Sequence, residues 1–284
     1  MVYSNSNTLK TELELVGRSR EILADDFKRH KNHLFNQING AKVLVIGGAG
    51  SIGSAIVQEI FSQKPKTLDI IDIDENGLVE LVRFLRIKFN FSPETFRIFT
   101  LDIGSTEFQF FLKSQKYYDY VLNLSALKHV RSEGDPFTLM RMIKVNIVNN
   151  INLIETLDQM SVKKFFCVSS DKAVDPYNVM GATKRLMELV ISCPTEKLVT
   201  SSARFANVAF SKGSLLYSFC RRFENFQPFI GPSDTQRYFI SHREAGLLCL
   251  FSLVLGKNAE VFFPKIGNEI RLQSFPEIAE RFLF

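Results

Sequence analysis

The first residues that could do chemistry lie in a glycine-rich segment, where Gly47, Gly50 and Gly53 recur at intervals of three. Glycines at this spacing let the chain turn tightly, let the backbone approach a pyrophosphate and let a helix pack closely on a strand. Ser51 and Ile52 stand where the helix would begin, and free N–H groups at that point attract phosphates. The segment therefore predicts a dinucleotide-binding turn, with a purely structural tight turn as the alternative.

An acidic residue follows this turn at a meaningful distance. Asp72 lies 19 residues after Gly53 and closes the next strand-like run. A carboxylate there accepts hydrogen bonds from the adenosine ribose hydroxyls and would repel a 2′-phosphate, so NAD is expected as the cofactor and NADP is disfavoured. Asp102 and Ile103, at the end of the third run, are expected on the adenine side, although Asp102 fits a strand-end turn nearly as well.

A second group of chemical interest lies between Val168 and Lys184 and contains Ser170, Asp171 and Lys172. It begins where a predicted strand leaves the sheet, which is the edge at which α/β proteins bind ligands. A neighbouring carboxyl and amine can act as an acid and a base if burial keeps the carboxyl protonated and the amine neutral. An exposed Asp–Lys pair on a loop is the alternative interpretation.

One position in this group departs from a simple motif. The glycine spacing is typical of short-chain dehydrogenase/reductase proteins, which use a Tyr-x3-Lys pair, and Lys184 is a candidate for its lysine. Met180 occupies the position of the tyrosine. A thioether neither donates nor accepts a proton in acid–base catalysis. The simple motif alone would therefore predict an inactive site.

Alternating strands and helices must position these groups. The continuous apolar run 42–46 predicts a buried parallel strand, and apolar residues at helical spacing follow the glycine turn. Further strand-like runs occur at 68–71, 96–101, 120–124, 165–168 and 198–203. Helical stretches lie between most of them, notably 138–160 and 180–191. This alternation predicts an α/β fold with a doubly wound parallel sheet covered by helices on both faces.

The chain changes character twice along its length. Residues 1–40 are polar with apolar positions at helical spacing, which predicts a helical N-terminal arm, and residues 41–212 form the expected NAD-binding domain. Residues 213–284 lose the alternation and predict a smaller substrate-binding lobe, with a helix at 242–255, a strand at 261–263 and an amphipathic helix after Pro276. The chain ends at Phe284 inside that helix, so the lobe is short, and a truncated lobe is left open.

Composition narrows the class of protein. The 284 residues are 45% hydrophobic and 23% charged, as in ordinary globular proteins, and the net charge of +5 is too weak and dispersed to predict nucleic-acid binding. Four widely spaced cysteines favour reduced thiols over disulfides or a metal site. The longest nearly apolar run, 245–255, is about half of what spans a bilayer. With no signal-like leader, we expect a cytoplasmic protein without a membrane span.

Three segments together are similar to a known family. They are NLSALKHV at 123–130, SSDKAV at 169–174 and NVMGATKR at 178–185. They resemble the nucleotide-sugar 4,6-dehydratases of polysaccharide biosynthesis, the CapD-like branch of the extended short-chain dehydrogenase/reductases, from about Val16 to Ile266. The resemblance implies an NAD-dependent enzyme that acts on UDP-N-acetylglucosamine in surface polysaccharide or glycan biosynthesis. One branch of that family carries methionine where another carries tyrosine, so Met180 marks a branch, and that branch favours retention at C5.

The resemblance also implies roles for the second group. In such enzymes C4 of the sugar is oxidised, the C5 proton becomes acidic and is removed, the C6 hydroxyl leaves as water, and hydride returns to C6. Lys172 is then the expected base at C5 and Asp171 the expected acid at C6. Neighbouring side chains of an extended segment diverge, so the two are expected to reach different atoms of the sugar. Ser170 is expected to relay the C4 hydroxyl proton, because Met180, at the position of the tyrosine, cannot accept it. Lys184 is expected at the nicotinamide ribose.

Four further residues are candidate substrate contacts. Lys128 and His129 follow the fourth strand, near the expected nicotinamide end, where Lys128 would meet sugar or phosphate. Asn207 and Arg237 match family positions expected near the UDP diphosphate, and the planar guanidinium of Arg237 suits phosphate oxygens. For each of the four, a structural role is nearly as well supported, and for His129 equally so.

Two alternative functions stay open. A UDP-sugar 4-epimerase would also oxidise C4 but would return hydride to the opposite face, leaving the water in place. A non-catalytic protein that binds NAD and a UDP-sugar is suggested by Met180 and by the abrupt end of the chain. In every case we expect a UDP-sugar partner and a homo-oligomer.

Overall fold

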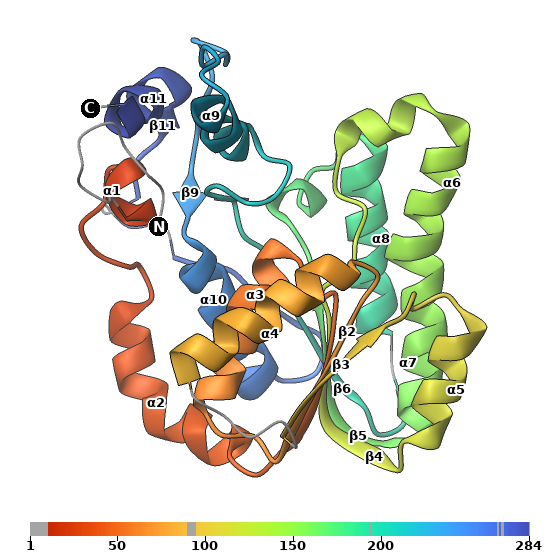
Figure 1. Cartoon of the computed structure of the whole chain (residues 1–284). Coiled ribbons are helices and arrows are strands. Elements are labelled where there is room, and N and C mark those ends of the chain that lie inside the picture. The colour runs from red at the N-terminus through yellow and green to blue at the C-terminus, as the bar shows by residue number, and fades with distance from the viewer. Residues whose placement is uncertain (1–10, 90–94, 194, 266, 268–269, 284) are drawn as a thin grey trace.

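A seven-stranded parallel sheet forms the centre of the computed structural model, which describes residues 11–283 apart from 90–94, 194, 266 and 268–269 (Figure 1). Residues 1–10 of the expected arm, Ile266 and Phe284 lie outside the described residues. The strand order is β10-β6-β5-β4-β1-β2-β3, and neighbouring strands pair in parallel. The strands are β1 (Lys42–Ile46), β2 (Thr67–Asp72), β3 (Phe96–Thr100), β4 (Tyr117–Asn123), β5 (Ser161–Val168), β6 (Val199–Ala203) and β10 (Glu260–Phe262). The predicted doubly wound α/β fold is confirmed.

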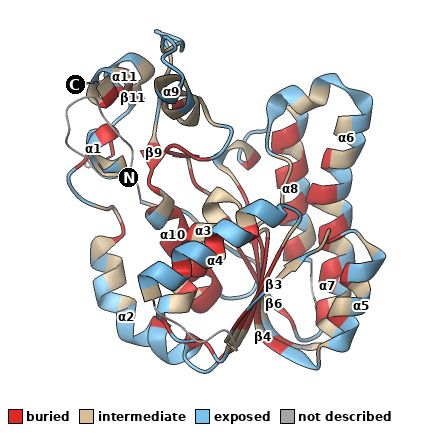
Figure 2. Ribbon diagram, viewed as in Figure 1, coloured by how far each residue is buried: buried red, intermediate tan, exposed pale blue. Residues whose placement is uncertain are grey.

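Helices cover both faces of the sheet because the strand residues are apolar on both sides. In β1, Val43 and Val45 enter one buried cluster, whereas Leu44 and Ile46 enter the other. The first cluster is covered by α2 (Ala24–Ile38), α3 (Ser51–Ser62), α4 (Glu75–Phe89) and α10 (His242–Leu255). The second is covered by α5 (Thr106–Ser114), α7 (Asn149–Gln159) and α8 (Val179–Ser192). Figure 2 shows the buried residues concentrated along these inner surfaces.

The smaller lobe lies at the end of the sheet where the strands finish (Figure 1). Its helices are α1 (Glu12–Leu15), α9 (Leu215–Glu224) and α11 (Phe275–Leu283). Two short strand pairs belong to it as well: β7 (Asn207–Val208) with β9 (Phe239–Ile240), and β8 (Gln236–Arg237) with β11 (Gln273–Ser274). Aromatic side chains form its core, where the rings of Phe219 and Phe229 stack at 4.7 Å.

The domain boundary expected at residue 213 does not separate the two parts of the fold, because two elements that follow it belong to the sheet domain. Both α10 and β10 fall within 213–284, yet β10 pairs with β6 as the edge strand of the sheet. The α10 helix is buried along nearly its whole length against α3, β5 and β6. These two elements therefore belong to the sheet domain, because a helix that is apolar all round needs cover on every side.

The N-terminal arm is also shared between the two parts. Leu15 of α1 packs in the core of the smaller lobe, whereas Leu34 and Ile38 of α2 pack in the core of the sheet domain. Three consecutive residues at the start of α10 hold the arm by side-chain pairs: His242 with Glu12, Arg243 with Glu21, and Glu244 with Arg18. The arm is thus an integral strap across both parts.

Candidate active site

A cavity of about 440 Å³ opens at the carboxyl ends of the strands, next to β1, where the order of the strands reverses. β1 lies between β2 and β4, so the connections on either side of it diverge and leave a crevice at the carboxyl ends of the strands. Most of the predicted site residues line this cavity: Gly47, Gly50, Ser51, Ile52, Gly53, Lys128, His129, Ser170, Asp171, Lys172, Lys184, Asn207 and Arg237. Asp72, Asp102 and Ile103 are not among its lining residues.

The glycine turn has a shape that larger residues would destroy. Gly47 has a φ of +79°, and a Cβ there would lie 2.7 Å from the backbone N of Ser125, at the end of neighbouring β4. A Cβ at Gly53 would lie 2.0 Å from the carbonyl oxygen of Gly47. Gly50 is different, because its Cβ position meets only that same oxygen, at 3.4 Å. Gly50 therefore keeps space open on the outer side of the turn, where α3 begins.

Asp72 is fixed against the back of this turn. Its carboxylate accepts hydrogen bonds from the N–H of Ala49 at 2.8 Å and from the N–H of Asp74 at 3.0 Å. Each oxygen keeps a free lone pair, so the carboxylate can still accept a hydroxyl. This arrangement couples the acidic group to the turn that would hold a pyrophosphate.

The two residues expected near the adenine have other partners. The carboxylate of Asp102 forms an ion pair with Arg141 at 2.6 Å and accepts the N–H of Gly104. Burial opposes ionisation of Asp102, but these bonds outweigh it and hold the pKa of the carboxyl below its usual value. Ile103 is buried and packs in the core with Phe108. An adenine contact from Asp102 remains a prediction.

The Ser170, Asp171 and Lys172 side chains meet on one oxygen atom. The Ser170 hydroxyl donates to Asp171 Oδ1 at 2.8 Å, and Lys172 Nζ lies 3.1 Å from that same oxygen. The sequence analysis expected neighbouring side chains of an extended segment to diverge. Asp171–Ala173 instead forms a single 3-10 turn after β5, and the turn folds the lysine back over the aspartate. The expectation of divergence was wrong.

The burial expected for this pair is also absent. The Asp171 side chain is 48% exposed and the Lys172 side chain 31% exposed. Both stand on the wall of the open cavity, where a turn beyond the strand end has no covering layer. The protein alone does not supply the desolvation that the sequence argument required, so any further burial must come from a bound molecule.

Met180 and Lys184 lie on the first turns of α8, beside the pair. Met180 is 3% exposed, and its N–H donates to Glu133 Oε1 at 2.7 Å. Lys184 is 4% exposed, and its Nζ donates to the carbonyl oxygen of Val168 at 2.9 Å. Burial lowers the pKa of the Lys184 amine. The buried amine is therefore held at the end of β5, next to the turn that carries Lys172.

A buried carboxylate behind β5, Glu188, was missed by the sequence analysis. It accepts the hydroxyl of Ser169 at 2.6 Å and two bonds from Arg204, at 2.7 and 2.5 Å. Burial alone would raise the pKa of Glu188, but the hydrogen bonds from Arg204 and Ser169 hold it below its usual value. Glu188 thereby fixes the strand exit that carries Ser170 and Asp171. A lone glutamate in a helical stretch gives no sequence signal for this.

A second buried group, Asn146, fixes the loop that carries Lys128. Its amide donates to Leu127 O at 2.9 Å and to Thr183 Oγ1 at 3.0 Å, and its oxygen accepts the N–H of Leu127 at 3.0 Å. Asn146 lies in a π-helical turn, Lys144–Val148, between α6 (Pro136–Ile143) and α7. Such turns frequently occur at functional sites. The sequence analysis expected one continuous helix here.

The four candidate substrate contacts come from three separate segments that line the cavity. Burial lowers the pKa of Lys128, and burial together with the neighbouring cations lowers the pKa of His129. The His129 ring packs on Gly213, where a Cβ would lie 2.8 Å from His129 Cε1. Asn207 and Arg237 begin and end their short strands at the entrance to the smaller lobe. The cavity is thus lined by basic side chains from several elements.

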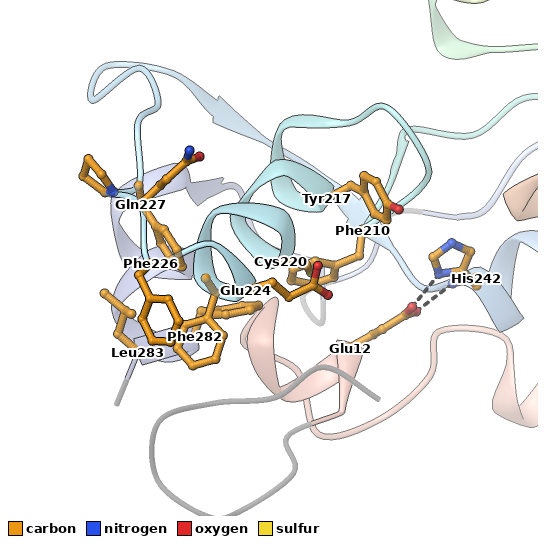
Figure 3. A pocket seen from close by; sticks show the side chains of 13 residues that line it. Glu12, Phe210, Tyr217, Cys220, Glu224, Phe226, Gln227, His242, Phe282 and Leu283 are labelled. Atoms are coloured by element: carbon orange, nitrogen blue, oxygen red, sulfur yellow. Dashed lines mark hydrogen bonds and ion pairs between the residues drawn. The ribbon is translucent and has the colours of Figure 1, made fainter.

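A larger cavity, of about 820 Å³, lies within the smaller lobe (Figure 3). Its walls are mainly aromatic, including Phe210, Phe226 and Phe282. Glu12 and His242 form its polar end. The Glu12 carboxylate accepts a hydrogen bond from the backbone N–H of His242, and its other oxygen lies against Nδ1 of the His242 ring. This pair serves the arm, so the smaller cavity at the sheet edge is the better candidate for chemistry.

Metal-binding clusters and membrane-spanning helices are both absent from the described part of the chain. Among these residues, no cluster of three or more His, Cys, Asp or Glu side chains could hold a metal ion. None of the helices in the same part is long and apolar enough to cross a bilayer.

A parallel sheet in this order, with a glycine turn after β1 and a polar cavity beside a smaller lobe, defines an extended short-chain dehydrogenase/reductase fold. The chain belongs to the polysaccharide biosynthesis protein family, whose model matches residues 43–282. The CapD-like resemblance is confirmed. The chain is 35% identical over 243 residues to the uncharacterized membrane protein MJ1061 of Methanocaldococcus jannaschii, covering 83% of this chain and 69% of that protein.

Other relatives carry more specific names. The probable polysaccharide biosynthesis protein EpsC of Bacillus subtilis is 31% identical over 90% of this chain, which spans only 44% of EpsC. A UDP-N-acetylglucosamine 4,6-dehydratase (inverting) of Campylobacter jejuni is 28% identical over 81% of this chain and 68% of its own length. A UDP-glucose 4-epimerase of Rickettsia bellii is 25% identical over 78% and 65%. The matches group the chain with nucleotide-sugar dehydratases and epimerases.

Solved structures agree with the fold. Pen from Bacillus thuringiensis has a TM-score of 0.75 and 26% identity, over 86% of this chain and 73% of that one. WbmF from Bordetella bronchiseptica, solved in complex with NADH, has a TM-score of 0.68 over 86% and 76%. At 18% identity, the likeness to WbmF supports the fold alone.

Proposed function

We propose that this chain is an NAD-dependent 4,6-dehydratase that converts UDP-N-acetylglucosamine to a UDP-4-keto-6-deoxy sugar. The observation that carries the proposal is the convergence of the Ser170 hydroxyl and the Lys172 amine on Asp171 Oδ1, inside the cavity that also contains the glycine turn. The Campylobacter relative named for this activity supports it. Membership of a polysaccharide biosynthesis family supports the biological setting.

The residues around the glycine turn fit a dinucleotide. Gly47 and Gly53 leave no room for a side chain, Gly50 leaves an open approach, and the free N–H groups at the start of α3 suit phosphate oxygens. Asp72 would hold the adenosine ribose and disfavour a 2′-phosphate, which supports NAD over NADP. Lys184 would donate to the nicotinamide ribose. The dinucleotide, when bound, supplies the oxidant for C4 and returns hydride to C6.

The arrangement on Asp171 Oδ1 suggests how the first proton moves. As C4 is oxidised, its hydroxyl proton passes to Ser170 Oγ while Ser170 gives its own proton to the carboxylate of Asp171, along the 2.8 Å bond. Asp171 then holds the proton that it later donates to the departing C6 oxygen. This route requires only that the Asp171 carboxylate is accessible in the cavity at the start. Prior burial of the carboxyl is unnecessary.

The same arrangement accounts for the second proton. Once Asp171 is neutral, the Lys172 amine loses its anionic partner, and a substrate that covers the amine disfavours the ammonium form, so Lys172 releases its proton to solvent. Neutral Lys172 removes the C5 proton, and the C6 hydroxyl leaves as water with the proton from Asp171. Lys172 returns its proton to C5 when hydride reaches C6. Substrate and product then differ by one water. Asp171 ends as the carboxylate that it was at the start, and Lys172 regains its proton from solvent when the product leaves.

Among the other residues that line the cavity, Lys128, His129, Asn207 and Arg237 would bind the UDP-sugar, with Arg237 on the diphosphate. The configuration at C5 follows from the face to which Lys172 returns the proton. The Met180 branch favours retention, whereas the Campylobacter relative is named as inverting. Proton NMR of the product distinguishes the two.

Mass spectrometry of UDP-N-acetylglucosamine incubated with the protein and NAD tests the proposal, which requires a product lighter by one water. A UDP-sugar 4-epimerase, favoured by the Rickettsia relative, would give a product of unchanged mass. A well-folded protein that binds NAD and the UDP-sugar but forms no product would support the non-catalytic alternative. Either result would refute the dehydratase assignment.

A further inference from the structure

One loop of the smaller lobe lies directly on the glycine turn. Residues 211–213 connect β7 to α9, and the backbone N–H of Lys212 donates to Ser51 Oγ at 2.8 Å. The Lys212 ammonium group lies 3.4 Å from the carbonyl oxygen of Ala49 and 3.4 Å from Asp74 Oδ2. The neighbours of Lys212 in the chain, Ser211 and Gly213, line the cavity. The loop therefore closes over the turn, with the lysine at its rim.

The protein groups around the Lys212 ammonium group stabilise its charge only weakly. Ser51 is the first residue of α3, and the positive end of a helix favours an anion over a cation. The partner carboxylate, Asp74, is 47% exposed, and Lys212 itself is 56% exposed. An exposed pair at 3.4 Å contributes little to stability. A phosphate between the helix and the ammonium group would satisfy both.

We infer that Lys212 is a latch for the cofactor, whose ammonium group moves from Asp74 to a diphosphate oxygen of the dinucleotide while its backbone N–H keeps the loop on Ser51. The inference rests on the dinucleotide site of the proposed function and deepens it. The latch would retain the cofactor between turnovers, because the proposed reaction regenerates NAD and does not require its release. The lysine ammonium group provides a point charge for the phosphate oxygen. The hydrogen bond from the backbone N–H of Lys212 to Ser51 Oγ holds the loop in place while the side chain moves.

Calorimetric titration of NAD, ADP-ribose, adenosine and NADP tests the latch without any need for catalysis. Lys212→Ala should weaken NAD and ADP-ribose about tenfold or more, as expected for the loss of one charge-assisted hydrogen bond. Adenosine, which lacks phosphate, should bind as before, and Lys212→Arg should restore most of the affinity. Lys31→Ala removes an exposed lysine from α2 and serves as the matched charge control.

The salt dependence gives an independent readout. Removal of a phosphate contact should reduce the dependence of NAD affinity on salt concentration, whereas a purely structural change should leave it intact. Equal losses for adenosine and ADP-ribose, or no loss at all, would overturn the latch and leave the dehydratase proposal standing. A loss confined to NADP would also overturn the latch, because it would place Lys212 at the 2′-position and not at the diphosphate. Wild-type protein that binds none of the four would refute the dinucleotide site itself.

Discussion

Lys172 Nζ lies 3.1 Å from Asp171 Oδ1, the atom that also accepts the Ser170 hydroxyl. Three side chains thus share one oxygen at the end of β5, with Glu188 fixing the strand behind them through Ser169. This relationship makes the roles of the three residues separable by experiment.

Lys172→Ala should abolish the incorporation of solvent deuterium at C5, because no other amine in the described cavity contacts Asp171. Turnover should fall by about 100-fold or more, the usual contribution of a positioned base. NAD titration on the same sample verifies that the site is intact. Undiminished deuterium exchange would remove Lys172 from the role of base.

Ser170→Ala should slow oxidation at C4, because the hydroxyl that leads to Asp171 is removed. Ser170→Thr keeps a hydroxyl and should recover most of the rate. Single-turnover measurement of NADH absorbance reports the first step directly. If both variants oxidise the sugar as fast as wild type, the relay through Ser170 is wrong.

The glycines of the turn should respond differently to alanine. Gly53→Ala places a Cβ 2.0 Å from a backbone oxygen and should cost roughly 1–3 kcal/mol of unfolding free energy. Gly50→Ala has room in the protein and should leave stability nearly unchanged while weakening the binding of NAD. Urea denaturation and NAD titration of both variants measure this contrast. Equal stability losses would contradict it.

The ionised side chain of Glu188 should stabilise the folded protein by an amount that decreases in acid. Its pKa is lowered from 4.5 in the folded protein, so its contribution is present above about pH 4.5 and is lost as the pH falls through the folded value. Glu188→Gln should cost about 3 kcal/mol at pH 7 by leaving Arg204 without its partner. The difference from wild type, measured by urea denaturation, should shrink below pH 4.5. A constant difference across this range would argue that the charge of Glu188 is unimportant.

The expected homo-oligomer has a candidate surface on α6 and α8. Phe137 and Met140 are 79% and 67% exposed on α6, and Leu186 and Leu189 are half exposed on neighbouring α8. Because such a patch is costly to leave in water, we predict self-association through it. Phe137→Asp with Met140→Asp should lower the mass measured by light scattering, whereas Ile87→Asp, on α4, should not. A wild-type monomer would refute the prediction.

The sequence predicted the sheet well because its strands are short apolar runs separated by clear turns. The bounds of β1 and α10 agree with the predicted 42–46 and 242–255. The assignment of α10 to the smaller lobe was wrong, since sequence order does not reveal that the chain returns to the sheet. The expected helix at 138–160 is continuous in the structure, but the π-helical turn within it was missed because a pattern of apolar residues does not distinguish such a turn from an α-helical one.

The candidate site was predicted in composition but not in geometry. The motifs identified Asp171 and Lys172. The local sequence predicts neither the 3-10 turn that joins these residues nor the exposure of their side chains. Lys212 was not singled out as a site residue because its partners, Ser51 and Asp74, are 161 and 138 residues away in the chain. Contacts of this range depend on the complete fold.

The buried pair of Arg18 and Glu244 has a mechanical consequence for the whole molecule. Glu244 receives both arms of the Arg18 guanidinium at 2.6 Å and the backbone N–H of Ile22, and Arg18 also donates to Phe239 O. Arg18 therefore bonds both to Glu244 of the sheet domain and to Phe239 of the smaller lobe, so separating the two parts would break these buried bonds. Rigid-body opening of the two parts is therefore disfavoured, because breaking a buried ion pair costs about 3–5 kcal/mol.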